Sequence, residues 1–304
     1  MAQRFPNVAL LGATGNLGPA ILDALRSAQP PFASITVLTR TSGATYPPDV
    51  HVKVVDYSSQ DSLVSALAGV DAVVSSLTPR GGDAQANALA AAVTAGVRFF
   101  IPSEFGLASS NAALNRDFPN WAAKVDVQQQ LAALRAAGTI DYALLYVGLF
   151  LDWGMQGMLV DLAGRRAELW DGGDTPIAFT TVASIAAAVV AVLEGRASDK
   201  VELRVKDVTL TQRRLLELSA QAVGPEGWVV TTYDTVQAYA KAKENAKVGI
   251  PDAEYAFLKR AFADGAYGTR WTADEDDSAA LGLKEWTEDD VVALLQRLAA
   301  GAEN

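Results

Sequence analysis

The sequence contains no cysteine and a single histidine, His51, among its 304 residues. Without thiols this chain cannot form disulfide bonds, zinc-thiolate sites, iron–sulfur clusters or cysteine nucleophiles. One histidine cannot supply a multi-histidine metal centre, and we expect His51, at a loop-to-strand junction, to be solvated. The acidic run at 274–277 lacks the spacing of metal ligands and is typical of a solvated loop. The sequence therefore predicts no metal site.

Positive charge and long hydrophobic runs are also scarce. The chain carries 25 Lys and Arg against 35 Asp and Glu, a formal net charge of −10. An acidic chain with no basic patch is repelled by phosphate backbones, which predicts no nucleic-acid partner. No apolar run reaches the roughly twenty residues that a membrane helix needs, so no membrane span is expected. An apolar strand begins directly after residue 6 and leaves no room for a leader, which favours a cytoplasmic location.

The first half of the sequence alternates short apolar runs with helix-sized segments. Half of all residues are hydrophobic, enough for a large core. Continuous apolar strands separated by helices indicate a parallel sheet buried on both faces. The predicted fold class is therefore α/β, with a Rossmann-like doubly wound sheet. Its strands are expected at residues 8–11, 35–38, 52–55, 72–74, 99–101 and 142–146.

Beyond Gly148 strands become sparse and helical patterns dominate. Short strands are predicted at 167–170, 177–180, 201–205 and 228–232. Helices are predicted at 182–193, 211–223, 235–245, 252–263 and 287–298, several of them after Ser, Thr or Asp caps. We therefore divide the chain into a doubly wound domain over 1–150 and a smaller helix-rich region over 151–304. The second region is expected to return at least one strand to the sheet.

A glycine-rich segment follows the first predicted strand and opens the first helix. Residues 12–18 read GATGNLG. The first glycine permits a tight turn, the second lets the backbone approach a pyrophosphate, and the third allows close helix–strand packing. The G-x-x-G-x-x-G spacing is similar to that of the short-chain dehydrogenase superfamily. Since helix N-terminal amides face phosphates, we expect a dinucleotide site. Its residues would be Gly12, Thr14, Gly15, Asn16, Leu17 and Gly18.

The end of the second strand indicates which dinucleotide binds. NAD-binding proteins place an acid there against the ribose 2′-hydroxyl, whereas this chain has Arg40. A guanidinium can bind a 2′-phosphate with two hydrogen bonds, which predicts NADP(H); an exposed arginine without a ligand is the alternative. Ser75 and Ser76, after the fourth strand, are expected to line the cofactor groove. Asp56 could contact the adenine or open the next turn, and the sequence favours neither.

A second motif follows the fifth strand. Residues 101–106 read IPSEFG, which resembles the (F/V/I)-P-S-E-F-G signature of the NmrA-like group. That group includes isoflavone, pinoresinol-lariciresinol and phenylcoumaran benzylic ether reductases. The glycine-rich segment, Arg40, the serine pair and this signature occur in the expected order, so the resemblance covers most of the chain. It implies that Ser103 and Phe105 contact the cofactor. It also implies that Phe150, Trp153 and Met155 form a substrate-pocket wall, although these side chains could equally belong to the core.

The resemblance further implies a catalytic lysine near the start of the next helix, and Lys124 lies at that position. The Tyr-x-x-x-Lys pair of most short-chain dehydrogenases is absent, because Asn120 stands where the tyrosine would be. The one literal match, Tyr239 with Lys243, lies outside the cofactor half and is expected on a solvated helix face. By resemblance, Lys124 relays a proton and contacts the nicotinamide ribose. Burial beside a cofactor would make its neutral form accessible, and an exposed helical lysine is the alternative.

These features together predict an NADPH-dependent reductase that transfers hydride to a small aromatic or conjugated substrate. Residues 1–150 would bind NADP(H), residues 151–304 would bind the substrate, and Lys124 would be the proton donor or acceptor. The alternative is a regulator of the NmrA type, which senses the cofactor without turnover. A third possibility is an isomerase or dehydratase that keeps the nucleotide as a fixture. Fold does not decide among them, and the sequence does not set the oligomeric state.

Overall fold

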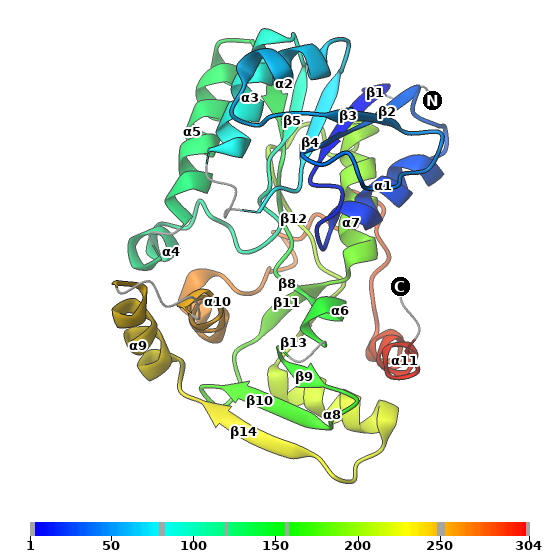
Figure 1. Ribbon diagram of the computed structural model, residues 1–304. Helices are drawn as coiled ribbons and strands as arrows, with labels where there is room; N and C mark the ends of the chain where they lie inside the picture. Colours follow the sequence, from blue (N-terminus) through cyan, green and yellow to red (C-terminus); the bar gives the residue numbers. More distant parts are fainter. Residues whose placement is uncertain (1–3, 79–82, 119–120, 156–157, 248–252, 302–304) are drawn as a thin grey trace.

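A six-stranded parallel sheet forms the centre of the first half of the chain in the computed structural model (Figure 1). The structure describes residues 4–78, 83–118, 121–155, 158–247 and 253–301. The strands lie in the order β3-β2-β1-β4-β5-β6, and every neighbouring pair is parallel. This order confirms the predicted Rossmann-like class. The strands are β1 (Asn7–Leu11), β2 (Ser34–Thr39), β3 (His51–Val54), β4 (Ala72–Ser75), β5 (Phe99–Ile101) and β6 (Asp141–Tyr142).

Helices cover both faces of this sheet (Figure 1). On one face, α1 (Gly18–Ser27) and α7 (Val182–Leu193) bury Ile21, Leu25 and Val189 against the strands. The other face carries α2 (Gln60–Leu67), α3 (Ala84–Thr94) and α5 (Ala122–Ala136). Each fully buried Leu, Ile or Val stabilises the fold by about 1.5–3 kcal/mol. The prediction of strands buried on both faces fails for the edge strand β3, where Val52 and Val54 are exposed.

The second half of the chain returns to the first. Helix α7 lies against α1, and Thr181 caps it by accepting a hydrogen bond from the amide of Ser184. Strand β12 (Glu202–Arg204) pairs in parallel with β7 (Leu144–Tyr146). Helix α7 lies beyond residue 150 in the sequence but packs in the core of the doubly wound sheet. The domain division at residue 150 stays a prediction.

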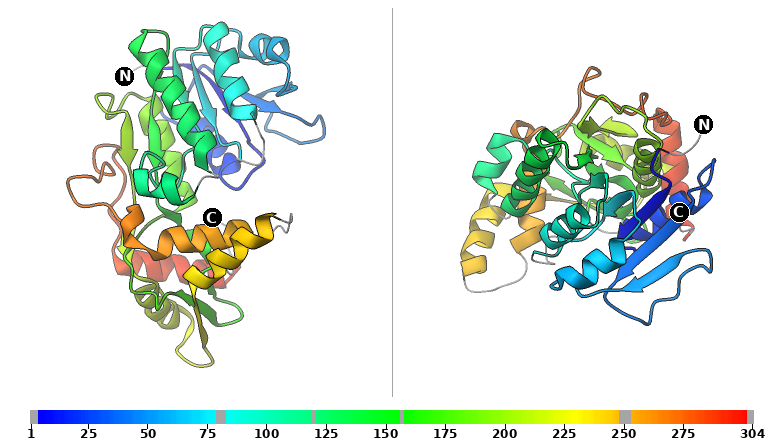
Figure 2. Two further views of the ribbon diagram at one scale, coloured as in Figure 1. Left: turned by 90° about the vertical axis from the view of Figure 1, so that its left-hand side faces the viewer. Right: turned by 90° about the horizontal axis from the view of Figure 1, so that it is seen from above.

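The remaining elements build a smaller unit around a third core (Figure 2). Its two small sheets have the orders β13-β11-β8 and β14-β10-β9, so they contain three strands, β8, β9 and β13, that the sequence patterns missed. The strands are β8 (Leu149–Phe150), β9 (Val160–Asp161), β10 (Arg166–Trp170), β11 (Ile177–Thr180), β13 (Val208–Leu210) and β14 (Val229–Tyr233). The helices are α4 (Ala112–Asp117), α6 (Leu151–Gly154), α8 (Gln212–Val223), α9 (Thr235–Lys247), α10 (Ala253–Ala263), η3 (Gly265–Tyr267) and α11 (Glu288–Ala299).

The acidic run at 274–277 is not the solvated loop that its composition predicts. Asp277 is buried and accepts hydrogen bonds from Lys200 Nζ at 2.5 Å and from the Arg204 amide at 2.9 Å. Asp276 accepts a hydrogen bond from Lys206 Nζ. Two of the four acids thus anchor this loop to β12 and the residues beside it. Within the described ranges no three His, Asp or Glu side chains could share a metal ion, and no helix is long and apolar enough to span a membrane.

Candidate active site

At two positions in the loop between β1 and α1, only glycine fits, because there is no room for a side chain. Gly12 has a φ of +82°, and a Cβ atom there would lie 2.7 Å from the backbone oxygen of Ser76. A Cβ atom at Gly18 would lie 2.2 Å from the oxygen of Gly12, so α1 approaches this turn only because residue 18 has no side chain. The Gly15 amide closes the turn by donating to the oxygen of Gly12 at 3.0 Å. Gly12 and Gly18 therefore set the path of the loop.

This geometry makes a stability prediction for Gly12→Ala. Holding an L-residue in the left-handed region costs about 1–2 kcal/mol, and the contact with Ser76 adds to that cost. Gly69 is a matched control, because its φ is +78° and open space surrounds the position of its missing Cβ. Urea titration should show a larger loss of unfolding free energy for Gly12→Ala than for Gly69→Ala. Equal losses would mean that the contact with Ser76 is not tight.

The N-terminus of α1 has no side-chain cap. Its N-cap residue, Leu17, makes no such hydrogen bond, which leaves the amides of the first turn, other than Pro19, available to an anion. Thr14 and Asn16 are exposed, as a cofactor contact requires. The Leu17 side chain instead lies in the core between the sheet and α1. Leu17 can therefore contribute only its backbone to the predicted cradle.

The two serines after β4 have different surroundings. Ser76 Oγ donates to the oxygens of Leu11 and Gly12, at 2.8 and 3.1 Å, and ties β4 to the glycine loop. Ser76 also lines the groove beside that loop. Ser75 is fully buried, and among the described residues its hydroxyl has no hydrogen-bond partner. Its side chain lies inside the sheet layer and does not line the pocket beside the loop, so its contact with a cofactor stays a prediction.

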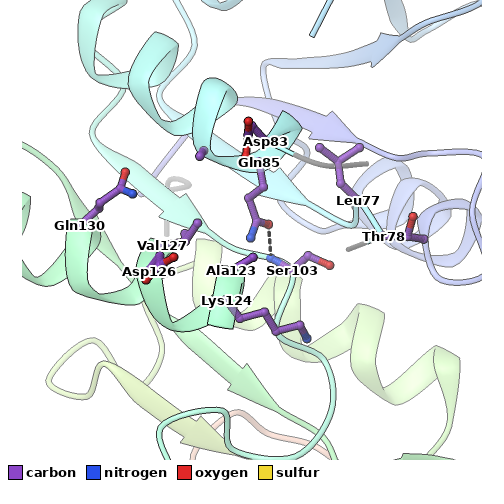
Figure 3. A pocket seen from close by; sticks show the side chains of 11 residues that line it. Leu77, Thr78, Asp83, Gln85, Ser103, Ala123, Lys124, Asp126, Val127 and Gln130 are labelled. Carbon is purple, nitrogen blue, oxygen red and sulfur yellow. Dashed lines mark hydrogen bonds between the residues drawn. The ribbon is translucent and has the colours of Figure 1, made fainter. Parts of the chain in front are cut away.

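Two adjoining pockets form one groove along the carboxyl ends of the parallel strands. Both pockets include Leu77 and Thr78, which follow β4. A crevice at this edge is where doubly wound sheets bind their ligands. The first pocket is lined by Gly12, Thr14, Gly15, Arg40, Tyr57, Ser76, Leu77, Thr78 and Ala84. The second is lined by Leu77, Thr78, Asp83, Gln85, Ala86, Ser103, Ala123, Lys124, Asp126, Val127 and Gln130 (Figure 3).

Arg40 and an aromatic side chain that the sequence analysis did not single out share the first pocket. Arg40 is exposed, and in the described part of the chain it forms no ion pair. Tyr57 lies beside it, and its hydroxyl donates to the oxygen of Leu38 at 3.2 Å. The carboxylate of Asp56 accepts hydrogen bonds from the amide and hydroxyl of Ser58, at 2.8 and 2.7 Å. Of the two interpretations of Asp56, the structure thus shows the turn-opening one.

Lys124 lies in the first turn of α5 and lines the second pocket (Figure 3). Its ammonium donates to the backbone oxygen of Glu104 at 2.6 Å. Burial lowers the pKa of Lys124, and the carboxylate of Glu104 acts against this by raising it. An amine with a lowered pKa is suited to proton exchange near neutral pH. Asn120, at the position of the missing tyrosine, lies outside the described residues.

The loop that carries the IPSEFG motif is held from the side of α3. The Ser103 amide donates to the side-chain oxygen of Gln85 at 2.7 Å, a contact drawn in Figure 3. Gln85 therefore positions Ser103 in the groove, a role that the sequence analysis missed. Phe105 has a φ of +29°, an unusual conformation for a bulky residue and one that concentrates at functional sites. Its side chain packs on the core beneath α1 and α7 and lines neither of the two pockets.

The predicted substrate wall follows β7 along the chain. Phe150 ends β8 and packs, half-buried, on the core beneath α1 and α7. Trp153 is half-buried in α6. Met155 is buried in the core of the smaller unit, so the core interpretation is the one that the structure shows for it. Contact of Phe150 and Trp153 with a substrate stays a prediction.

Tyr239 does not lie on a solvated helix face, as its spacing from Lys243 predicts. Its hydroxyl donates to the backbone oxygen of Asp117 at the end of α4. Its ring lies 5.2 Å, centroid to centroid, from those of Phe118 and Phe257. Tyr239 therefore joins α9 to the α4–α5 connection, and its partners lie too far along the chain for spacing to reveal them.

Comparisons with known proteins agree with this geometry. A model of the NmrA-like family matches residues 6–241. The oxidoreductase poxI of Penicillium oxalicum is 28% identical over 299 residues, which cover 94% of this chain and 92% of that protein. AtPrR2, solved with NADP+ and (+)-pinoresinol, superposes with a TM-score of 0.73 at 19% identity, covering 97% of this chain and all of the other. An Escherichia coli NADPH-dependent quinone oxidoreductase bound to NADPH gives 0.69 at 22%, covering 95% and 99%. The family match over most of its length shows that this chain belongs to the NmrA-like family.

Proposed function

We propose that this protein is an NADPH-dependent reductase that transfers a hydride to a small aromatic or conjugated substrate. The observation that carries the proposal is a pair of adjoining pockets that share Leu77 and Thr78, one lined by the glycine loop and Arg40 and the other by Lys124. A groove with phosphate-binding features at one end and a lysine at the other suits a dinucleotide whose reactive ring lies near that lysine. The relative named as an oxidoreductase supports the same reaction class.

The residues of the first pocket fit NADP(H). The uncapped α1 N-terminus offers amides to the pyrophosphate, and Gly15 lets the backbone come close to it. Arg40 lies at the end of β2, exposed and without an acidic partner in the described ranges. Its guanidinium would hold a 2′-phosphate with two hydrogen bonds. AtPrR2 and the quinone oxidoreductase were solved with NADP+ and NADPH, which supports this choice.

When bound, NADPH supplies the hydride from C4 of its nicotinamide ring. The chain then has to hold the nucleotide, exclude water and manage one proton. We assign the proton to Lys124 Nζ, which lines the second pocket and has a pKa lowered by burial. The carbonyl of Glu104 fixes Nζ in place, so the ammonium is oriented before the substrate arrives. Lys124 would release its proton to the oxygen that gains negative charge as the substrate is reduced.

The substrate class rests on two related structures and on the aromatic residues predicted to form the substrate wall. AtPrR2 was solved with (+)-pinoresinol, and the second neighbour is named a quinone oxidoreductase. Both names point to conjugated or aromatic ligands. In this chain, Phe150 and Trp153 are the half-buried aromatic residues that we assign to the substrate wall. A small aromatic ring is the ligand that such side chains favour.

A substrate screen tests the proposal. Purified protein would be saturated with NADPH, as verified by fluorescence titration, and mixed with conjugated ketones, quinones and phenylpropanoid ethers. We expect NADPH oxidation with at least one of these classes and much weaker oxidation of NADH. A fully loaded protein that oxidises NADPH with none of them would contradict a reductase. It would favour a cofactor-sensing regulator, which should bind NADP+ and NADPH with different affinities.

A further inference from the structure

A buried polar network lies directly behind Lys124. Glu104 is 1% exposed, and its carboxylate is held at both oxygens. Ser109 Oγ donates to one oxygen at 2.5 Å, and Gln128 Nε2 donates to the other at 3.0 Å. Gln128 also contacts the hydroxyls of Ser109 and Tyr146, at 2.5 and 3.3 Å. Hydrogen bonds at both oxygens fix the position of this buried carboxylate.

Helix α5 holds Glu104 at two points. Lys124 and Gln128 are four residues apart, so they lie on the same face of α5, one turn from each other. Lys124 binds the backbone oxygen of Glu104, and Gln128 binds its carboxylate. Glu104, in the loop after β5, therefore fixes the position of the Lys124 ammonium group and also carries the carboxylate that acts on its charge.

Among the described residues, the carboxylate of Glu104 has no direct counterion. Within the described ranges, no Lys or Arg nitrogen lies within ion-pair distance of this carboxylate. A buried carboxylate without a cation is costly even when it is hydrogen-bonded. The ammonium of Lys124 is the positive charge bound to the same residue. The carboxylate of Glu104 therefore favours the charged form of Lys124.

The other ionisable groups around Lys124 have weaker effects on its charge. Asp83 and Asp126 line the same pocket but are exposed, so water screens their charges. Tyr146, from β7, stays neutral because burial raises its pKa. The guanidinium of Arg204 lies 5.7 Å from the ring centre of Tyr146 and pairs with Glu202. Glu104 is thus the buried anion of this site.

We propose that Glu104 is a positioning residue for Lys124: its carbonyl fixes Nζ in the groove, and its buried carboxylate keeps the ammonium charged. Ser109 and Gln128 hold that carboxylate in place. The inference deepens the proposed function, because a lysine that must deliver a proton has to retain it until the substrate binds. Glu104 itself does not line either described pocket, so it acts through Lys124.

The test measures the protonation of Lys124 without relying on turnover. Trace acetylation with acetic anhydride at a series of pH values, read by mass spectrometry, gives the midpoint at which each lysine becomes reactive. Since the carboxylate raises the pKa of Lys124, Glu104→Gln should lower the Lys124 midpoint by about one pH unit. Glu104→Asp keeps the charge and should recover most of that change. The exposed Lys284 serves as the internal reference.

Two further variants distinguish a specific effect of Glu104 on Lys124 from a general effect on the fold. Glu168→Gln removes a carboxylate that pairs with Lys259 at 2.5 Å in the smaller unit, and it should leave the Lys124 midpoint unchanged. If Glu104→Gln does not fold, Gln128→Lys gives a second route. Its new ammonium would pair with Glu104 and cancel the effect of the carboxylate, so the Lys124 midpoint should again fall. An unchanged midpoint in Glu104→Gln, or in Gln128→Lys where that variant is needed, would overturn the proposal.

The same variants distinguish this inference from the proposed function. If Lys124 transfers the proton, the pH dependence of kcat/KM in Glu104→Gln should move to lower pH together with the labelling midpoint. A midpoint that moves while the pH dependence of NADPH oxidation stays in place would support the role of Glu104. It would contradict the proton-transfer role of Lys124.

Discussion

Lys124→Met should lower kcat/KM for substrate reduction by about 10²–10⁴-fold, the usual contribution of a general acid or base. Methionine fills a similar volume but carries no proton, so the substrate oxygen would have to take its proton from water. The dissociation constant of NADPH should change far less than kcat/KM, because the glycine loop and Arg40 lie in the other pocket of the groove. Steady-state kinetics with the substrate from the screen, combined with NADPH fluorescence titration, measures both quantities.

Lys53 offers a matched control for this variant. Its ammonium donates to the backbone oxygen of Ala66 at 2.7 Å, much as that of Lys124 does to Glu104 at 2.6 Å, but Lys53 lines neither pocket of the groove. Lys53→Met should therefore leave kcat/KM unchanged. Lys124→Arg should be as inactive as Lys124→Met, because a guanidinium holds its proton too tightly to release it. Equal activity in Lys124→Met and Lys53→Met would exclude Lys124 from the chemistry.

Arg40→Ala should raise the dissociation constant of NADPH by roughly 10- to 150-fold, the effect of losing about 1.5–3 kcal/mol of charge-assisted hydrogen bonding. The affinity for NADH should stay the same, since NADH carries no 2′-phosphate for the guanidinium to bind. The preference between the two nucleotides would then largely disappear. Fluorescence titration of both reduced nucleotides at one fixed ionic strength measures the change.

An exposed arginine outside the groove controls for the loss of surface charge. Arg270 is exposed and lines neither pocket, so Arg270→Ala should leave both dissociation constants unchanged. Salt should weaken NADPH binding more in the wild type than in Arg40→Ala, because screening acts on the removed contact. Equal losses of NADPH and NADH affinity in Arg40→Ala would contradict the 2′-phosphate assignment.

The central sheet could be predicted because its signals are local. Strand, turn and helix follow one another in sequence, and the glycines of the first turn are required by backbone geometry at Gly12 and Gly18. Local signals do not show which way a side chain points when both faces of a sheet are buried. Ser75 and Ser76 are neighbours in sequence, yet one lies inside the sheet layer and the other lines the groove.

The parts that the sequence did not reveal depend on partners far along the chain. Asp277 is buried because Lys200 lies across from it, and Tyr239 is held by Asp117, 122 residues earlier. Gln85 lies in the alanine-rich helix α3, and nothing in its own segment indicates that it binds Ser103. Tertiary contacts of this kind decide burial, and spacing within one segment carries no information about them.

Transfer of deuterium from C4-deuterated NADPH to the product tests the hydride-transfer proposal most directly. Both C4 epimers of the labelled cofactor would be incubated with the wild-type protein and its best substrate, and the product analysed by mass spectrometry. We predict that one epimer delivers a single deuterium to carbon in each product molecule, and that Lys124→Met delivers it far more slowly. A product without deuterium from either epimer, or labelled NADPH that stays reduced on a saturated protein, would contradict a reductase.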